Sequence, residues 1–325
     1  MTEHFLAWWN VENLFSVEND GDRSDKLARV IGAELVGWTA NILDKKLTQL
    51  TSVIKRLNSG KGPDILGLGE VENRKVLEQL IQKLAPLGRA YQVIHADTQD
   101  QRGIDIAFIY DSAKYKTLET EVFNHFILRR NATRDLVQVN FYTIPENRRL
   151  VIIGNHWPAR LGGELASEPY RIIAAETLAY WHERIMQIHG KDQGVVVMGD
   201  FNDEPFSRSM VDYALSERSP ARVKSARTKN PYLYNLMWEK MGQGEATHVF
   251  EGVSTVLDQI LVNRPLLRSE SALQLVAKSL EIIKYPEMLT KAGAPKRFGR
   301  PSSPNEFDVT GFSDHLPLAI VIKES

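Results

Sequence analysis

The sequence predicts an α+β fold, a sheet-rich sandwich with helices on its outer faces. Apolar runs of strand length, such as VVVM at residues 195–198, alternate along the chain with stretches of helical periodicity, such as residues 41–57. Residues 133–144 alternate apolar and polar side chains, as a half-exposed antiparallel strand does. Because this pattern is mixed among the buried runs, a sandwich is favoured over a doubly wound parallel sheet. No stretch has the composition of an interdomain linker, so residues 1–325 are expected to form one domain.

Strands are expected where short apolar runs end at polar or turn-forming residues. By this criterion the strands are residues 4–9, 64–68, 91–95, 104–110, 133–144, 149–154, 195–198, 255–262, 275–283 and 316–322. Helices are expected at residues 41–57, 73–84 and 167–188, with a short one at 207–215. In the helix at 167–188, Ser167 is expected to cap the N-terminus and Pro169 to lie in the first turn. Residues 16–37, 216–244 and 292–305 are expected to be irregular.

Composition restricts the class of protein. With 43% hydrophobic and 25% charged residues the chain is ordinary for a globular protein. No apolar run approaches the roughly 20 residues of a membrane span. The chain has no cysteine, which excludes disulfides, thiolate zinc sites and cysteine nucleophiles. Its net charge of -1 gives no global attraction for nucleic acid, so a polyanion would have to be held by a local patch or by metal.

The polar residues that end the expected strands are rich in oxygen donors. They are Asn10, Glu12, Glu70, Asn155, His156, Asp200, Asn202, Asp258, Asp314 and His315. One such strand end is as often a solvated loop as a site, but several matching ends favour a site at the rim of a rigid sheet. Hard oxygen ligands without sulfur suit Mg²⁺ or Mn²⁺ better than Zn²⁺. Histidine beside carboxylates supports acid–base chemistry near neutral pH, so metal-assisted attack of water on a phosphate ester is expected.

Six motifs carry a family resemblance. They are WWNVENLF at residues 8–15, GLGEVEN at 67–73, GNHWPAR at 154–160, GDFNDEP at 199–205, LDQILV at 257–262 and GFSDHLPL at 311–318. In this order they resemble the endonuclease/exonuclease/phosphatase superfamily over essentially the whole chain, and the first and third are most similar to bacterial nuclease-like members. The resemblance implies a deoxyribonuclease I-like fold, a four-layer α/β/β/α sandwich of two mixed sheets flanked by helices, with the site at one end.

The resemblance also implies metal ligands. Asn10 and Glu70 would hold Mg²⁺, with Mn²⁺ as an alternative ion and Asp314 nearby. Glu12 would either contribute to the metal or belong to a solvated loop. For Glu70 the competing interpretation is a strand-end carboxylate that pairs with Arg74 or Lys75.

Catalytic roles follow from the same resemblance. Asp200 would orient or deprotonate the attacking water, and Asn202 would donate to a phosphate oxygen. His315 would stabilise the transition state or act as the base. A buried Asp258 needs a partner, and it would orient the ring of His315. His156 would lie near the scissile phosphate.

Three further residues are expected to help bind the substrate. Asn155 would support the residues that contact the substrate without contacting it itself. Arg102 would contact a phosphate or be an exposed turn residue. Arg160 would form an anion-binding corner with Arg171 on the next helix, or the two would form salt bridges with Glu164 or Glu168.

Basic residues on the loop before the last motif suit contacts with a phosphate backbone, although a solvated loop looks the same. They are Lys296, Arg297 and Arg300. Three tryptophans, Trp8, Trp9 and Trp157, are expected to pack in the core or at its rim. The remaining histidines are expected at surface or structural positions: His4, His95, His125, His182, His189 and His248.

The function expected from the sequence is therefore Mg²⁺-dependent phosphodiester hydrolysis by a nuclease. The alternative is a phosphatase that acts on a small or lipid-derived phosphate. A binding protein with a dead site is disfavoured because the residues expected to act are all present. Nucleic acid is the expected substrate, with no membrane, no protein partner and a monomeric chain. The N-terminal residues lack the pattern of a secretion signal, which leaves the compartment open.

Overall fold

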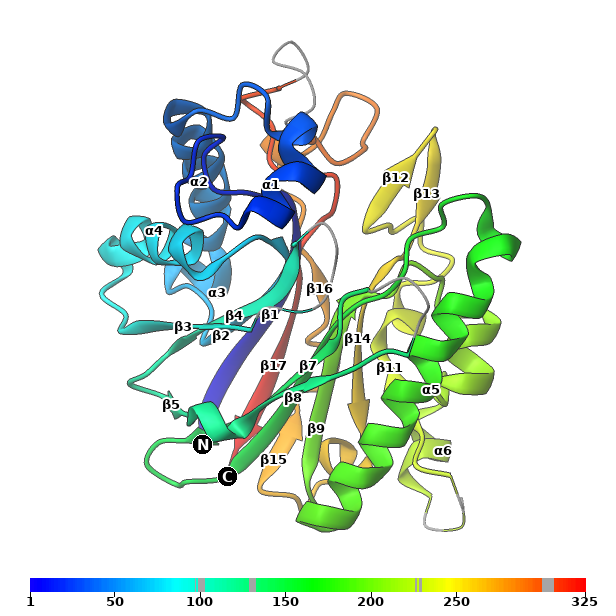
Figure 1. Ribbon diagram of the computed structural model, residues 1–325. Helices are drawn as coiled ribbons and strands as arrows, with labels where there is room; N and C mark the ends of the chain where they lie inside the picture. The colour runs from blue at the N-terminus through cyan, green and yellow to red at the C-terminus, as the bar shows by residue number, and fades with distance from the viewer. Residues whose placement is uncertain (97, 99–102, 129–132, 226, 228–229, 300–306) are drawn as a thin grey trace.

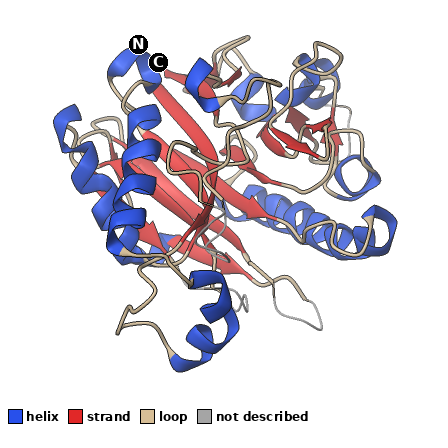
Figure 2. Cartoon of the chain, turned by 90° about the horizontal axis from the view of Figure 1, so that it is seen from above, coloured by secondary structure: helices blue, strands red, loops and turns tan. Residues whose placement is uncertain are grey.

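Two mixed β-sheets pack face to face in a computed structural model, with helices on their outer faces (Figure 1). The structure describes the chain apart from residues 97, 99–102, 129–132, 226, 228–229 and 300–306. Seen from above, the helices lie on either side of the layered strands (Figure 2). The α+β sandwich predicted from the sequence is confirmed.

The first sheet is built around the N-terminal strand. Its strands are β1 (Thr2–Leu14), β2 (Ile65–Val71), β3 (Tyr91–His95), β4 (Asp105–Asp111), β15 (Leu273–Leu275), β16 (Glu281–Ile282) and β17 (Leu318–Glu324). Their order is β15-β17-β1-β2-β4-β3, and β16 pairs with β17. The strand β1 runs parallel to β2 and antiparallel to β17. The central position of β1 explains why nearly all of its residues are buried.

The second sheet contains the VVVM run. Its strands are β5 (Tyr115–Lys116), β6 (Val122–His125), β7 (Leu136–Thr143), β8 (Arg149–His156), β9 (Gly194–Asp200), β10 (Ser216–Glu217), β11 (Leu233–Asn235) and β14 (Asp258–Asn263). Their order is β10-β11-β14-β9-β8-β7-β5, with β6 paired to β7. A separate two-stranded hairpin consists of β12 (His248–Phe250) and β13 (Val253–Thr255). It projects beyond the sandwich in Figure 1.

Helices cover both sheets. They are α1 (Asp25–Ile31), α2 (Ala40–Ile54), α3 (Leu57–Gly60), α4 (Arg74–Leu84), α5 (Glu164–His189) and α6 (Pro220–Lys224). The predicted stripe of α2 is buried, with Leu43, Leu47 and Leu50 packed in the core of the first sheet. The long helix α5 packs on the second sheet through Ala174, Ala175 and Leu178. Within the described part of the chain, no helix combines the length and apolarity needed to cross a membrane.

Several element boundaries differ from those predicted. Residues 16–37 are not irregular throughout, because α1 forms there and buries Ile31. The helix α5 begins at Glu164, so Ser167 lies inside it and does not cap it. The Ser167 hydroxyl instead donates to the carbonyl oxygen of Gly163 at 2.7 Å. Pro169 consequently lies beyond the first turn. Strong local signals near the true ends produced these errors, which are of the size expected for helix boundaries.

Candidate active site

Three neighbouring strands of the second sheet carry polar residues at the same end of the sheet. His156 ends β8, Asp200 ends β9 and Asp258 begins β14. The parallel register pairs His156 with Asp200, and the antiparallel register pairs Asp258 with Asp200. Gly199 permits this approach, because a Cβ atom there would lie 2.2 Å from the carbonyl oxygen of Asn155. The strand pairing therefore places an imidazole and two carboxylates side by side.

The first sheet supplies the facing groups. Asn10 on β1 pairs with Gly69 on β2, so Glu70 follows beside it. The turn before β17 passes the same strand, where the Ser313 hydroxyl donates to the carbonyl oxygen of Asn10 at 2.7 Å. This turn carries Asp314 and His315, and the backbone N–H of His315 donates to Ser313 Oγ at 3.1 Å. The three chain segments thus hold their polar side chains at the same end of the sandwich.

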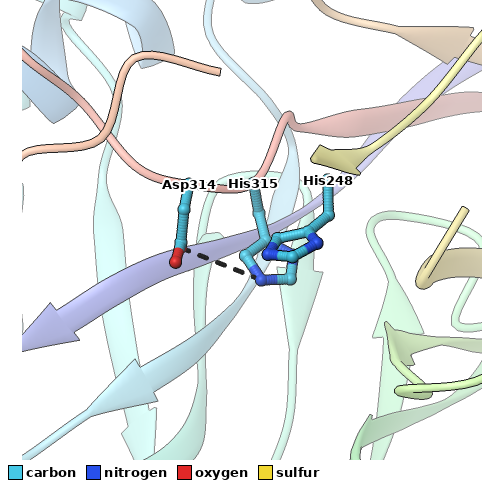
Figure 3. Close-up of side chains that lie close together, drawn as sticks. All are labelled: His248, Asp314 and His315. Carbon is cyan, nitrogen blue, oxygen red and sulfur yellow. Dashed lines mark ion pairs between the residues drawn. The ribbon is translucent and has the colours of Figure 1, made fainter. Parts of the chain in front are cut away.

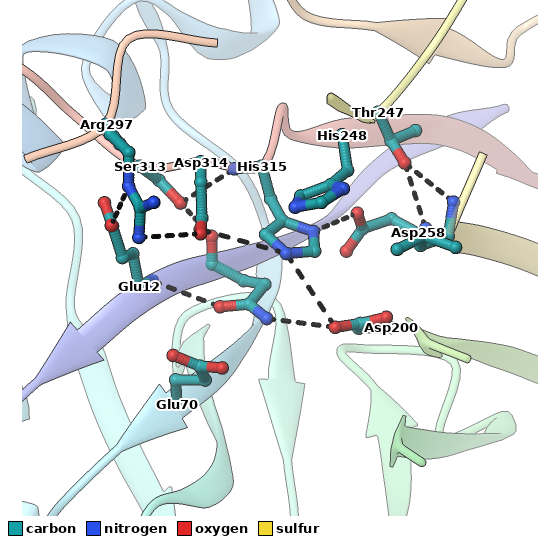
Figure 4. A network of polar contacts seen from close by, with 12 residues as sticks. Glu12, Glu70, Asp200, Thr247, His248, Asp258, Arg297, Ser313, Asp314 and His315 are labelled. Carbon is teal, nitrogen blue, oxygen red and sulfur yellow. Dashed lines mark hydrogen bonds and ion pairs between the residues drawn. The ribbon is translucent and has the colours of Figure 1, made fainter. Parts of the chain in front are cut away.

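Contacts between the two sheets join these groups into one cluster (Figure 4). Asn10 Nδ2 donates to Asp200 Oδ2 at 3.2 Å. His156 Nε2 lies 3.7 Å from both Glu70 Oε1 and Asp200 Oδ2. His315 Nε2 lies 3.9 Å from Asp200 Oδ2 and 3.8 Å from Asp314 Oδ1. The structure therefore brings together the residues for which the sequence predicts metal binding and catalysis, apart from those discussed below.

The predicted contact between Asp258 and His315 is present. His315 Nδ1 donates to Asp258 Oδ2 at 2.6 Å, and the carboxylate is fully buried. The second oxygen of Asp258 accepts from the Trp8 indole at 2.9 Å. The Trp9 indole donates to the carbonyl oxygen of His315 at 2.9 Å. The adjacent tryptophans, which are buried as predicted, therefore hold both members of the pair in place.

Electrostatics set the two catalytic candidates in opposite protonation states. Burial alone would lower the pKa of His315, but the charge and hydrogen bond of Asp258, with Asp200 and Asp314 nearby, raise its pKa well above 6.5. Burial raises the pKa of Asp200 to about 6, opposed by the charge of His315 and supported by that of Asp258. Near pH 7 these shifts favour a protonated imidazole together with an ionised Asp200 carboxylate.

The donor set at this end of the sandwich fits a hard divalent cation. Asn10, Glu70 and Asp314 offer amide and carboxylate oxygens without sulfur, as Mg²⁺ and Mn²⁺ prefer. The fully buried Lys46 lies behind them and donates from Nζ to the carbonyl oxygen of Phe312 at 2.6 Å. Burial lowers the pKa of Lys46 to about 8 against the attraction of the nearby acids, Asp314 and Glu70 among them. The carboxylates thus form a cluster of negative charge that a cation would neutralise.

Glu12 does not fit as a metal ligand. Its Oε1 accepts from Arg297 Nε at 2.8 Å, and its Oε2 accepts from the backbone N–H of Phe298 at 2.9 Å. The strand register shifts between Asn10 and Leu14, and Glu12 has a φ of 53°. In a regular strand residues 10 and 12 would share a face, but this bulge breaks the alternation. Glu12 therefore anchors the basic loop at Arg297.

Two of the predicted site residues, Asn155 and Asn202, make hydrogen bonds to backbone groups around the site. Asn155 is fully buried, with its amide donating to the carbonyl oxygen of Ile153 and its Oδ1 accepting from the Trp157 indole. This burial agrees with the expectation that Asn155 supports the residues that contact the substrate. Asn202 Nδ2 donates to the carbonyl oxygen of Trp157 at 3.0 Å, and its backbone N–H donates to Asp200 Oδ1 at 2.9 Å. Asn202 thus orients Asp200, and its predicted donation to phosphate stays a prediction.

Of the two arginines predicted to bind the substrate, Arg102 and Arg160, the structure describes only Arg160. Arg160 Nε donates to the carbonyl oxygen of Asn202 at 2.8 Å, and its Nη1 lies 3.4 Å from Glu164. Arg171 is buried and pairs with Asp203 at 2.8 Å. Arg160 therefore makes the predicted ion pair with Glu164, whereas Arg171 pairs with Asp203, and anion binding by these two residues stays a prediction. Arg102 lies outside the described residues, as does Arg300 of the basic loop.

Arg134 is a candidate that the sequence patterns missed. Its Nη2 lies 2.7 Å from His156 Nε2, and both side chains are buried. Since a guanidinium only donates, His156 Nε2 must accept and its proton resides on Nδ1. Arg134 lies two residues before β7, within the segment predicted as a half-exposed strand. No pattern in the sequence predicted that this cation would lie beside His156 in the candidate active site.

His248, which was expected at a surface or structural position, packs directly against the candidate site. It forms a backbone bridge with His315, and the two ring centroids are 4.6 Å apart (Figure 3). Burial and the charge of His315 lower the pKa of His248 to about 4. A neutral imidazole therefore packs beside the protonated one. The hairpin β12–β13 is joined to the candidate site at this residue.

A model of the "Endonuclease/Exonuclease/phosphatase family" matches residues 5–324. The chain belongs to this family. A search of curated protein sequences finds no match. Members of the family hydrolyse phosphoric esters and generally use a divalent metal ion, so the chain is a hydrolase of phosphoric esters.

Solved structures share the fold of this family member at low sequence identity. The 2′,3′-cyclic phosphatase ANGEL2, in complex with adenosine-2′,3′-vanadate, has a TM-score of 0.63 and 15% identity, with 98% of this chain and 95% of that chain covered. A mannosyl-6-phosphatase of Bacteroides thetaiotaomicron has a TM-score of 0.58 and 14% identity, with 98% and 99% covered. The catalytic domain of human Nocturnin has a TM-score of 0.57 and 17% identity, with 99% and 95% covered.

Proposed function

We propose that this family member is a Mg²⁺-dependent phosphodiesterase that acts as a nuclease. The observation that carries the proposal is the arrangement of Asp200 and His315. An ionised carboxylate and a protonated imidazole, with His315 Nε2 3.9 Å from Asp200 Oδ2, lie beside the oxygen donors of Asn10, Glu70 and Asp314. This pairing of a base with an acid suits attack of water on one side of a phosphorus centre.

Asn10, Glu70 and Asp314 would hold the metal ion. When bound, the ion would neutralise charge on the phosphate and so favour attack by water. Lys46 and Arg297 lie on the same side of the cluster and moderate the negative charge of these acids. The site therefore combines acids that would bind a cation with positively charged side chains that would attract a phosphate.

Proton transfer is assigned to the groups with raised pKa values. Asp200 Oδ2 orients the attacking water and accepts its proton, which a carboxylate with a pKa of about 6 does more readily than an ordinary aspartate. His315 Nε2 donates to a phosphate oxygen as charge develops there, while Asp258 holds the ring from Nδ1. His156, which accepts from Arg134, carries that guanidinium close to the same phosphate.

A polyanion is favoured over a small phosphate ester by the cations that extend around the site. Arg134 lies inside it, and residues 290–299 carry three basic residues and no acidic one. Such a patch provides the local attraction for a polyanion that the net charge of -1 lacks. The second candidate is a phosphatase of a small phosphate ester, since the structural neighbours include a mannosyl-6-phosphatase and a 2′,3′-cyclic phosphatase.

The test is hydrolysis of a substrate panel with Mg²⁺, Mn²⁺ or a chelator. The panel contains single-stranded DNA, RNA, plasmid, an abasic duplex, bis(p-nitrophenyl) phosphate and inositol phosphates. We expect metal-dependent cleavage of diesters that is lost in Asp200→Ala and His315→Ala, with circular dichroism unchanged. A clear preference for monoesters would support the phosphatase, and activity in the presence of chelator would contradict the metal dependence.

A further inference from the structure

A groove of about 1010 Å³ lies between the projecting hairpin and the basic loop. Val249, Phe250 and Ser254 line it on the hairpin side, and Pro295, Lys296 and Arg297 line it on the loop side. We call this cavity the hairpin groove. Its volume lies at the top of the range of about 300–1,000 Å³ that small-molecule sites occupy, so it suits a larger ligand.

Both walls of the hairpin groove begin at the candidate active site. On one side, His248 starts the hairpin and bridges to the backbone of His315. On the other, Arg297 Nη2 lies 3.4 Å from Asp314 Oδ2 while its Nε binds Glu12 (Figure 4). A chain held by its phosphate at His315 therefore has the groove directly next to it.

The loop wall is held firmly against the catalytic turn. The backbone N–H of Phe312 donates to the carbonyl oxygen of Lys296 at 2.7 Å. A Cβ atom on Gly311 would lie 2.0 Å from the carbonyl oxygen of Arg297, so only glycine permits this contact. A backbone bridge between Leu289 and Pro295 closes the rest of the loop. The groove is consequently preformed, which reduces the entropy lost when a ligand binds.

The two walls present different chemistry to a ligand. Phe250 is 63% exposed although it is a large apolar residue on a two-stranded hairpin. Across the groove, the Arg297 side chain is 53% exposed. Both described cations of this wall are paired, Lys296 with Asp308 and Arg297 with Glu12 and Asp314, and Arg297 is the more exposed of the two. An exposed aromatic ring opposite a guanidinium is the combination that proteins use to stack bases and contact phosphates of a single strand.

We propose that the hairpin groove binds the single-stranded nucleic acid that continues from the scissile phosphate, with Phe250 stacked on a base and Arg297 facing a phosphate. This assignment rests on the proposed nuclease function and defines its substrate as a single strand of several nucleotides. A zwitterionic or anionic membrane is the competing occupant, because an exposed apolar hairpin tip also suits a lipid surface. The loop wall that faces Phe250 across the groove and carries Arg297 favours the strand.

The activity test compares a substrate too small to enter the hairpin groove with one long enough to fill it. Bis(p-nitrophenyl) phosphate occupies only the catalytic centre, whereas an eight-nucleotide single strand also fills the groove. We expect Phe250→Ala to lower kcat/KM on the oligonucleotide about 10-fold, mainly through KM, since one base-stacking contact is lost. Ser254→Glu should have a similar effect that shrinks at high salt. Hydrolysis of the small diester should be unchanged in both variants, and so should both activities in the control Phe126→Ala, a 52% exposed phenylalanine away from the groove.

A binding test separates the groove from the chemistry. Fluorescence anisotropy of a labelled oligothymidine in the presence of chelator should show about 10-fold weaker binding to Phe250→Ala and no change for Phe126→Ala. Binding that is equal in all three proteins would overturn the groove assignment while leaving the proposed function intact. Failure of the wild type to cleave any diester, with Phe250-dependent binding retained, would overturn the proposed function alone. Phe250-dependent sedimentation with phosphatidylcholine–phosphatidylserine vesicles, without oligonucleotide binding, would assign the groove to a membrane and reject a strand.

Discussion

Replacing Asp258 by asparagine should disable His315 through the orientation of one amide. Trp8 donates to Asp258 Oδ1 at 2.9 Å, so the oxygen of the new amide is held at the indole. Its NH₂ group then faces His315 Nδ1, which at present donates to Asp258 Oδ2 at 2.6 Å. Nδ1 can only accept from an amide N–H. The ring is therefore driven to the neutral form with its proton on Nε2.

The size of the effect follows from the lost interaction. A hydrogen bond to a charged group contributes about 1.5–3 kcal/mol. At about 1.4 kcal/mol for each pKa unit, the pKa of His315 should fall by about 1–2 units. A misoriented acid–base group loses about 10²–10⁴-fold in rate, so kcat on a phosphodiester should fall by that factor.

The pH dependence of stability should change as well. Folding raises the pKa of His315 above its ordinary value of 6.5, so ionisation of His315 stabilises the folded protein fully below about pH 6.5. That contribution is lost as the pH rises from 6.5 through the raised pKa. Asp258→Asn should largely remove this slope in urea-unfolding measurements.

Long-range ¹⁵N NMR of the metal-free protein between pH 5 and 9 reports both the pKa and the tautomer of His315, and steady-state kinetics with saturating Mg²⁺ reports kcat. Trp8→Phe added to Asp258→Asn supplies a matched control. Without the indole donor the amide is free to turn its oxygen to His315, and part of the activity should return. An unchanged pKa together with kcat within about threefold of wild type would refute the reasoning, as would a double variant less active than the single one.

Three further predictions concern the acids and the buried lysine. Asp200→Asn should abolish hydrolysis yet raise the free energy of unfolding of the metal-free protein at pH 8 by about 1–3 kcal/mol, because the pKa of Asp200 is raised from 3.8 to about 6 and its ionised form is disfavoured above that pH; a variant no more stable than wild type in urea unfolding would contradict this. Glu70→Gln should lose most of the stabilisation of about 2.7 kcal/mol that Mg²⁺ gives at about 100 times its Kd, measured by thermal unfolding with and without the ion; equal shifts in both proteins would count against Glu70 as a ligand. Lys46→Met should raise the free energy of unfolding of the metal-free protein at pH 7 by about 1–3 kcal/mol, because burial lowers the pKa of Lys46 from 10.5 to about 8 and the lost hydrogen bond to Phe312 offsets only part of this gain. Mg²⁺ should stabilise this variant more than wild type, and identical responses to Mg²⁺ would show that Lys46 does not compensate the acids.

Local patterns predicted the fold well because burial leaves a periodic signal. The stripe of Leu43, Leu47 and Leu50 is buried as expected, and the VVVM run is a central strand. Less regular signals failed at element ends. The cap assigned to Ser167 was wrong because a glycine-preceded turn starts α5 earlier.

The candidate site was predictable where a single strand end carries the chemistry. Asp200, Asp258 and His315 were expected to lie together, and they do. The pairing of neighbouring strands places the residues at their ends side by side. Glu12 illustrates the limit of that rule. A bulge after Asn10 changed its face, and nothing in the spacing of the motif revealed the bulge.

The sequence by itself determined the α+β architecture, the six motifs and the oxygen-rich chemistry of the strand ends, since each is written in neighbouring residues. Only the tertiary structure decided which distant side chains complete the site. Trp8 reaches Asp258, Arg134 reaches His156, and His248 lies on His315. These pairs depend on how two sheets pack and how a hairpin folds back, and residues far apart in the chain carry no local signal of such contacts.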